Sequence, residues 1–184
     1  MAVFSSPNFR RAHLTLAALA IAFALAGCGF QLRGQTTLPF ATLYVPGTTA
    51  LAVELKRNIA SGTQTKLVES ADKAQAQLIM SVDQREKVIL SFNSAGRVRE
   101  FQLKYKFGFR VVDTRGREFL PENEITLTRD VSFNDAQVLA KEAEETLLYR
   151  EMQTDMVQQI LRRMGGAGKP ISLESEAAPP AKPK

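Results

Sequence analysis

One stretch decides the fold, and it reads Phe101-Gln102-Leu103-Lys104-Tyr105-Lys106-Phe107-Gly108-Phe109-Arg110-Val111. Every odd-numbered position in it is aromatic or aliphatic, whereas the even-numbered positions are polar, charged or glycine. Successive side chains of a β-strand point to opposite faces, so this strict alternation predicts a strand with one apolar and one polar face. We therefore expect a sheet that is buried on one side and carries a row of cations on the other.

The segments on either side of this stretch also have the pattern of strands. In residues 78–92 most of the apolar side chains fall on even positions, and we expect one face to carry Leu78, Met80, Val82, Val88, Leu90 and Phe92. Residues 125–133 alternate in the same way. Two runs of turn-forming residues, at 93–96 and 113–116, separate the three segments. The sequence thus predicts three consecutive strands in an antiparallel meander with one apolar face.

Two further segments have the period of an amphipathic helix. Residues 50–61 follow Thr48 and Thr49, either of which can cap a helix, and the stripe consists of Leu51, Leu55 and Ile59. Residues 136–164 end at two glycines, and their stripe consists of Leu148, Met152, Met156, Ile160 and Met164. A short strand is predicted at 42–46, and residues 66–69 are a candidate for another. We predict an α+β fold, a two-layer sandwich whose mostly antiparallel or mixed four-stranded sheet carries both helices on one face.

The N-terminus has the composition of an export signal. Residues 1–13 include Arg10 and Arg11, and residues 14–26 are apolar except for one threonine. This run is shorter than the roughly 20 apolar residues of a spanning helix, and a basic start with a short apolar run is typical of a secretory signal peptide. Leu25-Ala26-Gly27-Cys28 resembles the lipoprotein box of bacteria, which implies cleavage before Cys28 and covalent attachment of a diacylglycerol and an N-acyl chain. Residue 29 is Gly and not Asp. By resemblance to the sorting pattern of enterobacterial lipoproteins, the absence of Asp at this position favours the outer membrane.

These observations divide the chain and exclude several kinds of chemistry. We expect a signal peptide (1–27), a lipidated tether (28–41), one α/β domain (42–164) and a disordered tail (165–184) that is rich in proline and glycine. The one histidine, His13, leaves with the signal, and the one cysteine carries lipid. The mature chain then has neither imidazole nor thiol, which excludes Ser-His-Asp and Cys-His catalysis and zinc held by histidine or cysteine.

Cations on the central strands are the candidate binding residues. The chain has a formal net charge of +5; Lys104 and Lys106 share the polar face of their strand, and Arg97 and Arg99 follow the first turn. Such side chains hold phosphates as point charges or bidentate forks. An exported protein meets anionic envelope lipids rather than nucleic acid. The alternative is a solvated face whose charges serve solubility.

Further residues resemble a known family. Cys28-Gly29-Phe30-Gln31-Leu32-Arg33 is similar to the start of the mature LptE lipoproteins, the outer-membrane partners of the β-barrel LptD in lipopolysaccharide (LPS) assembly. The order of strands and helices and the segments 132–135, 139–142 and 160–164 resemble that family as well. The resemblance covers about residues 25–164.

The resemblance implies a protein that is not an enzyme and uses no cofactor. It implies a plug and assembly partner of an LptD-like barrel, in a hetero-complex of one copy of each, that binds LPS through basic residues. One family position, just before the last helix, matches Lys141. The other lies in the turn after the long second strand, where this chain has no cation before Arg97. The candidate LPS- or anion-binding residues are therefore Lys141, Arg97, Arg99, Lys104 and Lys106.

Two other interpretations stay open. The first is a lipid-anchored periplasmic adaptor or binding module of another envelope transport system, which co-purification with a barrel would distinguish. The second is an envelope hydrolase, which would need two carboxyl groups about 5–10 Å apart in a cleft. Its candidate acids are Glu100, Asp113, Glu118, Glu122, Glu124 and Asp130.

Overall fold

The computed structural model describes residues 36–168. The predictions for the signal peptide, for Cys28 and for the tail beyond residue 168 lie outside these residues. The described chain belongs to one compact unit that begins at Gln35. Its elements are β1 (Thr42–Tyr44), α2 (Ala50–Gly62), β2 (Lys66–Leu67), η1 (Ala71–Lys73), β3 (Ala76–Phe92), β4 (Val98–Val112), β5 (Glu118–Ser132), η2 (Asp135–Gln137) and α3 (Val138–Gly165).

The sheet has five strands, in the order β2-β1-β3-β4-β5. The predicted antiparallel meander is confirmed, since β4 pairs antiparallel with both β3 and β5. The predicted number of four strands is wrong, because the candidate strand at 66–69 does form. It is β2, which pairs parallel with β1 through Lys66 and Leu67 alone. Two residues cannot show an alternation, so a strand this short leaves no periodic signal in the sequence.

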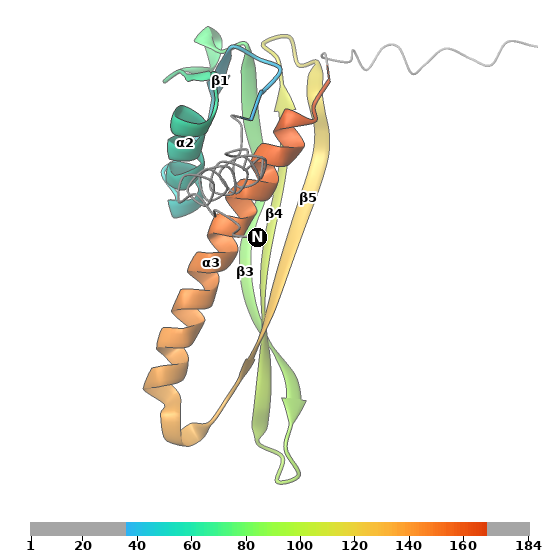
Figure 1. Ribbon diagram of the computed structural model, residues 1–184. Helices are drawn as coiled ribbons and strands as arrows, with labels where there is room; N and C mark the ends of the chain where they lie inside the picture. The colour runs from blue at the N-terminus through green and yellow to red at the C-terminus, as the bar shows by residue number, and fades with distance from the viewer. Residues whose placement is uncertain (1–35, 169–184) are drawn as a thin grey trace, which may run out of the picture. The chain divides into compact units, whose positions relative to one another are not determined.

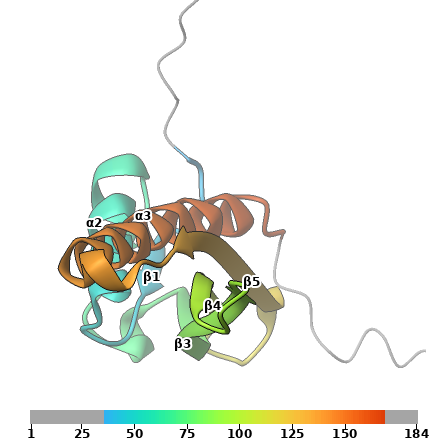
Figure 2. The ribbon, with the colours of Figure 1, turned by 90° about the horizontal axis from the view of Figure 1, so that it is seen from below.

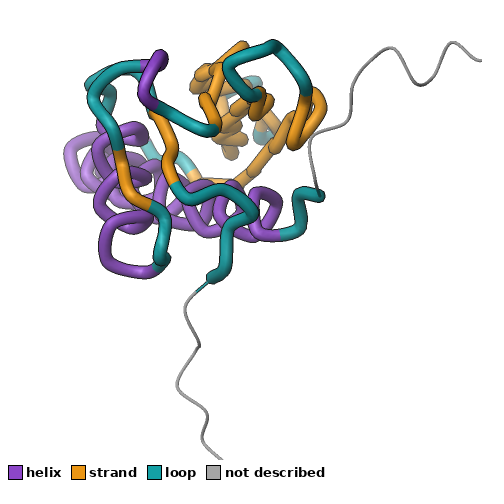
Figure 3. Tube along the Cα trace, turned by 90° about the horizontal axis from the view of Figure 1, so that it is seen from above, coloured by secondary structure: helices purple, strands orange, loops and turns teal. Residues whose placement is uncertain are grey.

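Both helices cover the same face of the sheet, as the views along the strands show (Figures 2 and 3). The side chain of Thr49 caps α2 by accepting a hydrogen bond from the backbone N–H of Ala52 at 3.2 Å. The apolar stripes predicted for the two helices and the odd-numbered residues of β4 are confirmed, because they pack together in one hydrophobic core. Its fully buried side chains include Leu51, Leu55, Ile59, Leu103, Tyr105, Phe107, Phe109, Met152 and Met156. None of the helices within residues 36–168 combines the length and apolar character needed to cross a membrane.

The predicted face of β3 is wrong for the middle of the strand, where Val82 and Val88 lie on the open face. Met80 pairs with Phe109, but Val82 pairs with Gly108, so Ser81 is an extra residue in the ladder. Paired residues point to the same side of a sheet, and a one-residue shift moves all later side chains to the other face. Between Asp83 and Ile89 it is therefore the odd positions that face the helices. A second extra residue follows between Ile89 and Ser91.

The bulge explains why a glycine interrupts the aromatic strand. Gly108 lies opposite the bulge, and a Cβ there would collide with the hydroxyl of Ser81 and lie 3.3 Å from Cβ of Val82. The polar face of β4 thus needs a residue without a side chain at this one position.

The sheet narrows from one end of the molecule to the other. β1 pairs with β3 only as far as Tyr44 and Gln77, so most of β3 has β4 as its sole partner. Pairing of β5 with β4 reaches Glu100 and Ser132, whereas β3 and β4 stay paired to Phe92 and Val98. Residues 91–99 therefore form a two-stranded extension, the hairpin arm, which projects at the bottom of Figure 1. We call this end, which comprises the hairpin arm, its base at residues 89 and 90, and residues 133–141, the lower end. The opposite end, with the β4–β5 turn, is the upper end.

Candidate functional site

The turn at the tip of the hairpin arm, residues 93–97, is held by Asn93. Its side-chain Oδ1 accepts hydrogen bonds from the backbone N–H groups of Ala95 and Arg97, both at 3.0 Å. The backbone N–H of Asn93 donates to the carbonyl of Arg97 at 2.8 Å, and Gly96 supplies the left-handed conformation with φ 72°. The turn is thus closed by a neutral amide, which leaves the Arg97 side chain out of the turn.

Arg97 is the most accessible of the predicted cations at this end. Its side chain is 71% exposed, and its guanidinium lies 3.6 Å from a carboxylate oxygen of Asp135, which is itself exposed. Ion pairs of this kind contribute little in water and exchange readily with other partners. The pair places Arg97 beside the connection from β5 to α3.

Arg99 lies two residues further along β4. Its side chain is 65% exposed and reaches a carboxylate oxygen of Glu100 at 3.4 Å. The hydroxyl of Ser91 donates to Glu100, and this bond, together with the charge of Arg99, holds the pKa of that carboxyl below its usual range. The backbone carbonyl of Arg99 accepts from the N–H of Phe133 at 2.8 Å, so Arg99 borders the same connection as Arg97.

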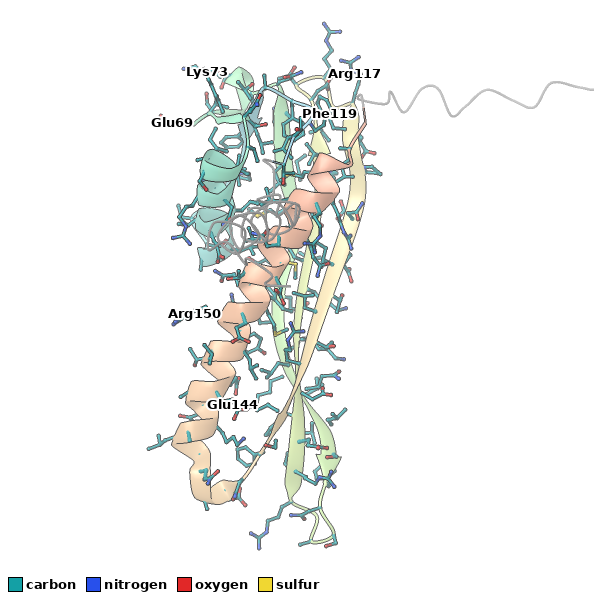
Figure 4. The ribbon with its side chains drawn as sticks, viewed as in Figure 1. Glu69, Lys73, Arg117, Phe119, Glu144 and Arg150 are labelled. Atoms are coloured by element: carbon teal, nitrogen blue, oxygen red, sulfur yellow. The ribbon has the colours of Figure 1, made fainter. Side chains whose placement is uncertain are left out.

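Lys141, on the first turn of α3, is held more firmly. Its side chain is only 19% exposed, and its ammonium donates to Ser132 at 2.9 Å and to Glu144 at 2.8 Å. Glu144 lies on the lower half of α3, far from the upper-end residues Arg117 and Phe119 (Figure 4). Lys141 therefore ties α3 to the end of β5 and offers an anion less of its surface than either arginine does.

The structure separates Lys104 and Lys106 from this group. Both occupy the even positions of β4, on the open face of the sheet, while the odd positions carry the core beneath the helices. Lys104 pairs with Glu86 and Thr128, and Lys106 with Gln84 and Thr126. The open face is therefore a mixed surface of cations, carboxylates and hydroxyls rather than the basic row that β4 alone predicts.

Two cations of β3, Arg85 and Lys87, belong to the helix-covered face. The guanidinium carbon of Arg85 lies 4.7 Å from the ring centre of Tyr105 and 5.5 Å from that of Tyr149, and its guanidinium donates to Gln153 at 2.9 Å. The ammonium of Lys87 lies 4.4 Å from the ring centre of Phe101 and contacts Glu145 at 2.5 Å. The shift at Ser81 puts both cations there, and simple alternation carries no signal of it.

This polar seam, formed by Arg85 and Lys87, divides the layer between α3 and the sheet. Above it Met152 and Met156 are fully buried, whereas at its lower side Lys87 and Lys141 hold the helix by polar contacts. Burial raises the pKa of Tyr105 to about 12, so its hydroxyl stays protonated beside Arg85.

A small apolar crevice lies below the seam, between the first turns of α3 and the sheet. Its volume is about 260 Å³, and its apolar walls are Phe101, Val131, Phe133 and Val138. The rings of Phe101 and Phe133 meet edge to face at 5.3 Å. Lys87, Lys141, Glu142 and Glu145 stand at its rim.

The shifted carboxyl pKa values of the described residues argue against a hydrolytic pair there. The carboxyl pKa values that clearly depart from their usual range within residues 36–168, those of Glu100 and Asp113, are both lowered rather than raised. A general acid needs a raised value. The same residues contain no cluster of three or more His, Cys, Asp or Glu that could hold a metal ion.

The sequence of this chain is similar to those of known lipoproteins. The sequence profile of the LptE family, described as lipopolysaccharide-assembly, matches residues 40–164. The chain is 29% identical over 151 residues to the LPS-assembly lipoprotein LptE of Pectobacterium atrosepticum, covering 76% of this chain and 77% of that protein.

Solved structures share the fold. An uncharacterized lipoprotein B from Nitrosomonas europaea superimposes with a TM-score of 0.66 at 45% identity, over 75% of this chain and 91% of that one. The rare lipoprotein B from Shewanella oneidensis gives a TM-score of 0.58 at 26% identity, over 68% of this chain and 94% of that one.

Proposed function

The chain belongs to the LptE family of lipopolysaccharide-assembly lipoproteins, and from this premise we propose that it binds LPS at its lower end and acts as plug and partner of an LptD-like β-barrel. As a member of this family it is an envelope-associated protein that is not an enzyme and has no cofactor. We further propose that it is anchored in the outer membrane by the acyl chains on Cys28. Several acyl chains on one residue suffice for a firm anchor.

The grouping of Arg97, Arg99 and Lys141 around one connection is the observation that carries the LPS proposal. Arg97 contacts Asp135, the backbone of Arg99 contacts Phe133, and Lys141 contacts Ser132. LPS carries phosphates, which guanidinium groups hold as bidentate partners. The exposure of the two arginines makes them the primary ligands, with Lys141 as a positioning residue beside them.

The open face of the sheet supports the barrel partnership. The lumen of an outer-membrane barrel is polar, and a plug inside it needs a polar surface of its own. The even positions of β4 and β5 provide one, with Lys104, Lys106, Thr126, Thr128 and Asp130 on the same side. We propose that Lys104 and Lys106 contact the barrel wall rather than LPS.

Titration of the full-length chain with LPS at fixed salt tests the first proposal. We expect the double substitution Arg97→Ser with Arg99→Ser to weaken binding by about tenfold or more, since each charge-assisted contact contributes roughly 1.5–3 kcal/mol before solvent screening. Arg115→Ser is the matched control, because Arg115 is an exposed cation of the upper turn. Equal losses in the double variant and the control would contradict a lower-end site.

Affinity purification of the full-length protein from its own envelope tests the second proposal. We expect a large outer-membrane barrel in equal amount, and less of it with Lys104→Glu and Lys106→Glu combined. LPS titration of that variant should match the wild type. A lipidated wild-type protein that recovers no barrel would rule out the plug and favour the adaptor.

A further inference from the structure

The lower end exposes apolar side chains that nothing else in the described chain covers. Seven large apolar residues within residues 36–168 are exposed, and five of them belong to this end. They are Ile89, Leu90, Phe92, Val138 and Leu139. Single exposed apolar residues are normal on a protein surface, but a group of them next to one another marks a binding surface.

The geometry of the hairpin arm explains why three of these residues are uncovered. Ile89 and Leu90 lie at its base, and Phe92, a residue that is 59% exposed, lies near its tip. Beyond Glu100 the arm has neither β5 nor a helix against it. Contiguous exposed apolar side chains lower solubility, and a bound partner would offset that cost.

This exposed surface continues into the crevice beneath α3. Ile89 pairs with Phe101, so the two side chains lie side by side on the helix-covered face. Phe101 forms the crevice wall with Phe133, and Val138 closes it from the helix. An extended apolar ligand lying along the arm would therefore meet the mouth of the crevice.

The charges beside this surface identify the kind of ligand. Arg97 and Arg99 are on the same arm and are the most exposed of the lower-end cations. The crevice rim, by contrast, has its lysines neutralised by Glu144 and Glu145. The tip of the arm thus suits anionic groups, whereas its base and the crevice suit uncharged chains. A phosphorylated glycolipid has both parts, with phosphates at one end and acyl chains at the other.

We propose that the hairpin arm binds the acyl chains of LPS, with Phe92, Leu90 and Ile89 against the chains and the crevice at Phe101 and Phe133 receiving a chain end. This inference rests on the proposed LPS function and adds a second, apolar half to its site. The arm then removes acyl chains from water while its arginines hold the phosphates.

The test compares intact LPS with LPS whose acyl chains have been removed and whose phosphates are kept. The full-length lipidated chain is held in phospholipid nanodiscs, and binding of each probe is titrated at fixed salt. We expect Leu90→Ser with Phe92→Ser to lower the affinity for intact LPS by about tenfold, because two half-buried apolar contacts are lost. Binding of the deacylated probe should not change. Val53→Ser is the matched control, since Val53 is 52% exposed on α2 at a distance from the arm.

The outcomes separate this inference from the function on which it rests. If the Leu90 and Phe92 variant binds intact LPS like the wild type while the Arg97 and Arg99 variant loses both probes, the acyl site is wrong and the LPS function stands. If the wild type binds neither probe, the LPS function itself fails. If the apolar variant changes only the self-association of the protein, the acyl site is wrong and the surface is a contact between copies.

A second variant guards against a folding defect. The variant is Leu139→Ser, because Leu139 belongs to the exposed apolar group of the lower end. Leu139 is 82% exposed, so the fold does not depend on it. We expect it to lower the affinity for intact LPS by about two- to fivefold at an unchanged unfolding midpoint. No loss in this variant together with a lowered midpoint in the arm variant would overturn the proposal.

Discussion

The two hairpin turns of the meander have the same backbone conformation and hydrogen bonds, but they differ in the side chain of their first residue. In each, the backbone N–H of the first residue donates to the carbonyl of the fifth at 2.8 Å, the fourth is a glycine with φ above 70°, and the first side chain accepts two backbone N–H groups. The lower turn has Asn93 in this position and the upper turn has Asp113. The difference is one amide in place of one carboxylate.

That difference decides what happens to the arginine that ends each turn. Asp113 is buried and binds the guanidinium of Arg117 at 2.7 Å as well as the backbone. Asn93 carries no charge, and its side chain accepts only from the backbone N–H groups of Ala95 and Arg97, so the Arg97 side chain extends into solvent. The upper turn uses its arginine for the fold, and the lower turn leaves its arginine accessible to an external anion.

The largest expected effect concerns the aromatic residue beside each turn. Phe119, near the upper turn, is buried and packs edge to face on Phe40 at 5.5 Å, whereas Phe92 precedes the lower turn and is exposed. We expect Phe119→Ala to lower the free energy of unfolding by about 3–5 kcal/mol and Phe92→Ala by less than about 0.5 kcal/mol. Urea denaturation measures both. A large loss with Phe92→Ala would show that the arm is part of the folding core.

The second effect concerns the glycines. Gly116 and Gly96 both have positive φ, at 79° and 72°, and at both positions the space that an added methyl group would occupy has no neighbouring atom within 4 Å, so an alanine would introduce backbone strain alone. That strain is about 1–2 kcal/mol. We expect Gly116→Ala to lower global stability by this amount and Gly96→Ala by less, because a two-stranded arm can open locally. Hydrogen exchange at the two turns, with urea denaturation, distinguishes local from global loss.

The third effect depends on pH. Burial raises the pKa of Asp113, but hydrogen bonds from the side chain and backbone of Arg117 and the backbone of Arg115 outweigh it and hold that pKa below its usual 3.8. A carboxyl whose pKa is lower in the folded state than in the unfolded state stabilises the fold at pH values above the unfolded-state pKa. This stabilisation is lost as the pH falls through the folded-state pKa. We expect acid to destabilise the chain from about pH 5 downward, and Asp113→Asn to flatten that slope. An unchanged slope would mean that other carboxyls dominate.

The smallest effect converts the lower turn into the upper one. Asn93→Asp keeps the turn acceptor and adds a carboxylate that Arg97 can bind. We expect LPS affinity to fall about two- to fivefold, in line with roughly 0.5–1 kcal/mol for an exposed ion pair. Ser94→Asp is the control, since it adds the same charge outside the acceptor position. Equal losses from both would indicate general repulsion rather than capture of Arg97.

The sequence predicted the parts of the fold that are long and periodic. The alternation from Phe101 to Val111 and the stripes of both helices correspond to the observed core. The two-residue β2 could be predicted only as a candidate, at residues 66–69, since its pairing depends on where β1 brings the chain. Of the candidate site residues, Arg97, Arg99 and Lys141 lie around the connection from β5 to α3, while Lys104 and Lys106 lie on the open face of the sheet. Their binding roles stay predictions.

What the sequence could not show was the role of Arg85 and Lys87. Their place beneath α3 depends on a bulge, and bulges have no periodic signature of their own. The one available signal was Gly108, whose missing side chain in an otherwise aromatic strand marks a close approach of the neighbouring strand.

The two extra residues of β3 cancel each other: the first shifts the side-chain alternation by one residue, and the second shifts it back. Ser81 moves the strand into a second frame, in which Arg85 and Lys87 face inward, and Leu90 returns it to the first. Deletion of Ser81 alone would turn every side chain between the two extra residues to the other face, placing Gln84 and Glu86 against the aromatic core. Comparison of such strands between relatives therefore requires the frame to be established first, and a lost residue at one bulge should be matched by a loss at the other.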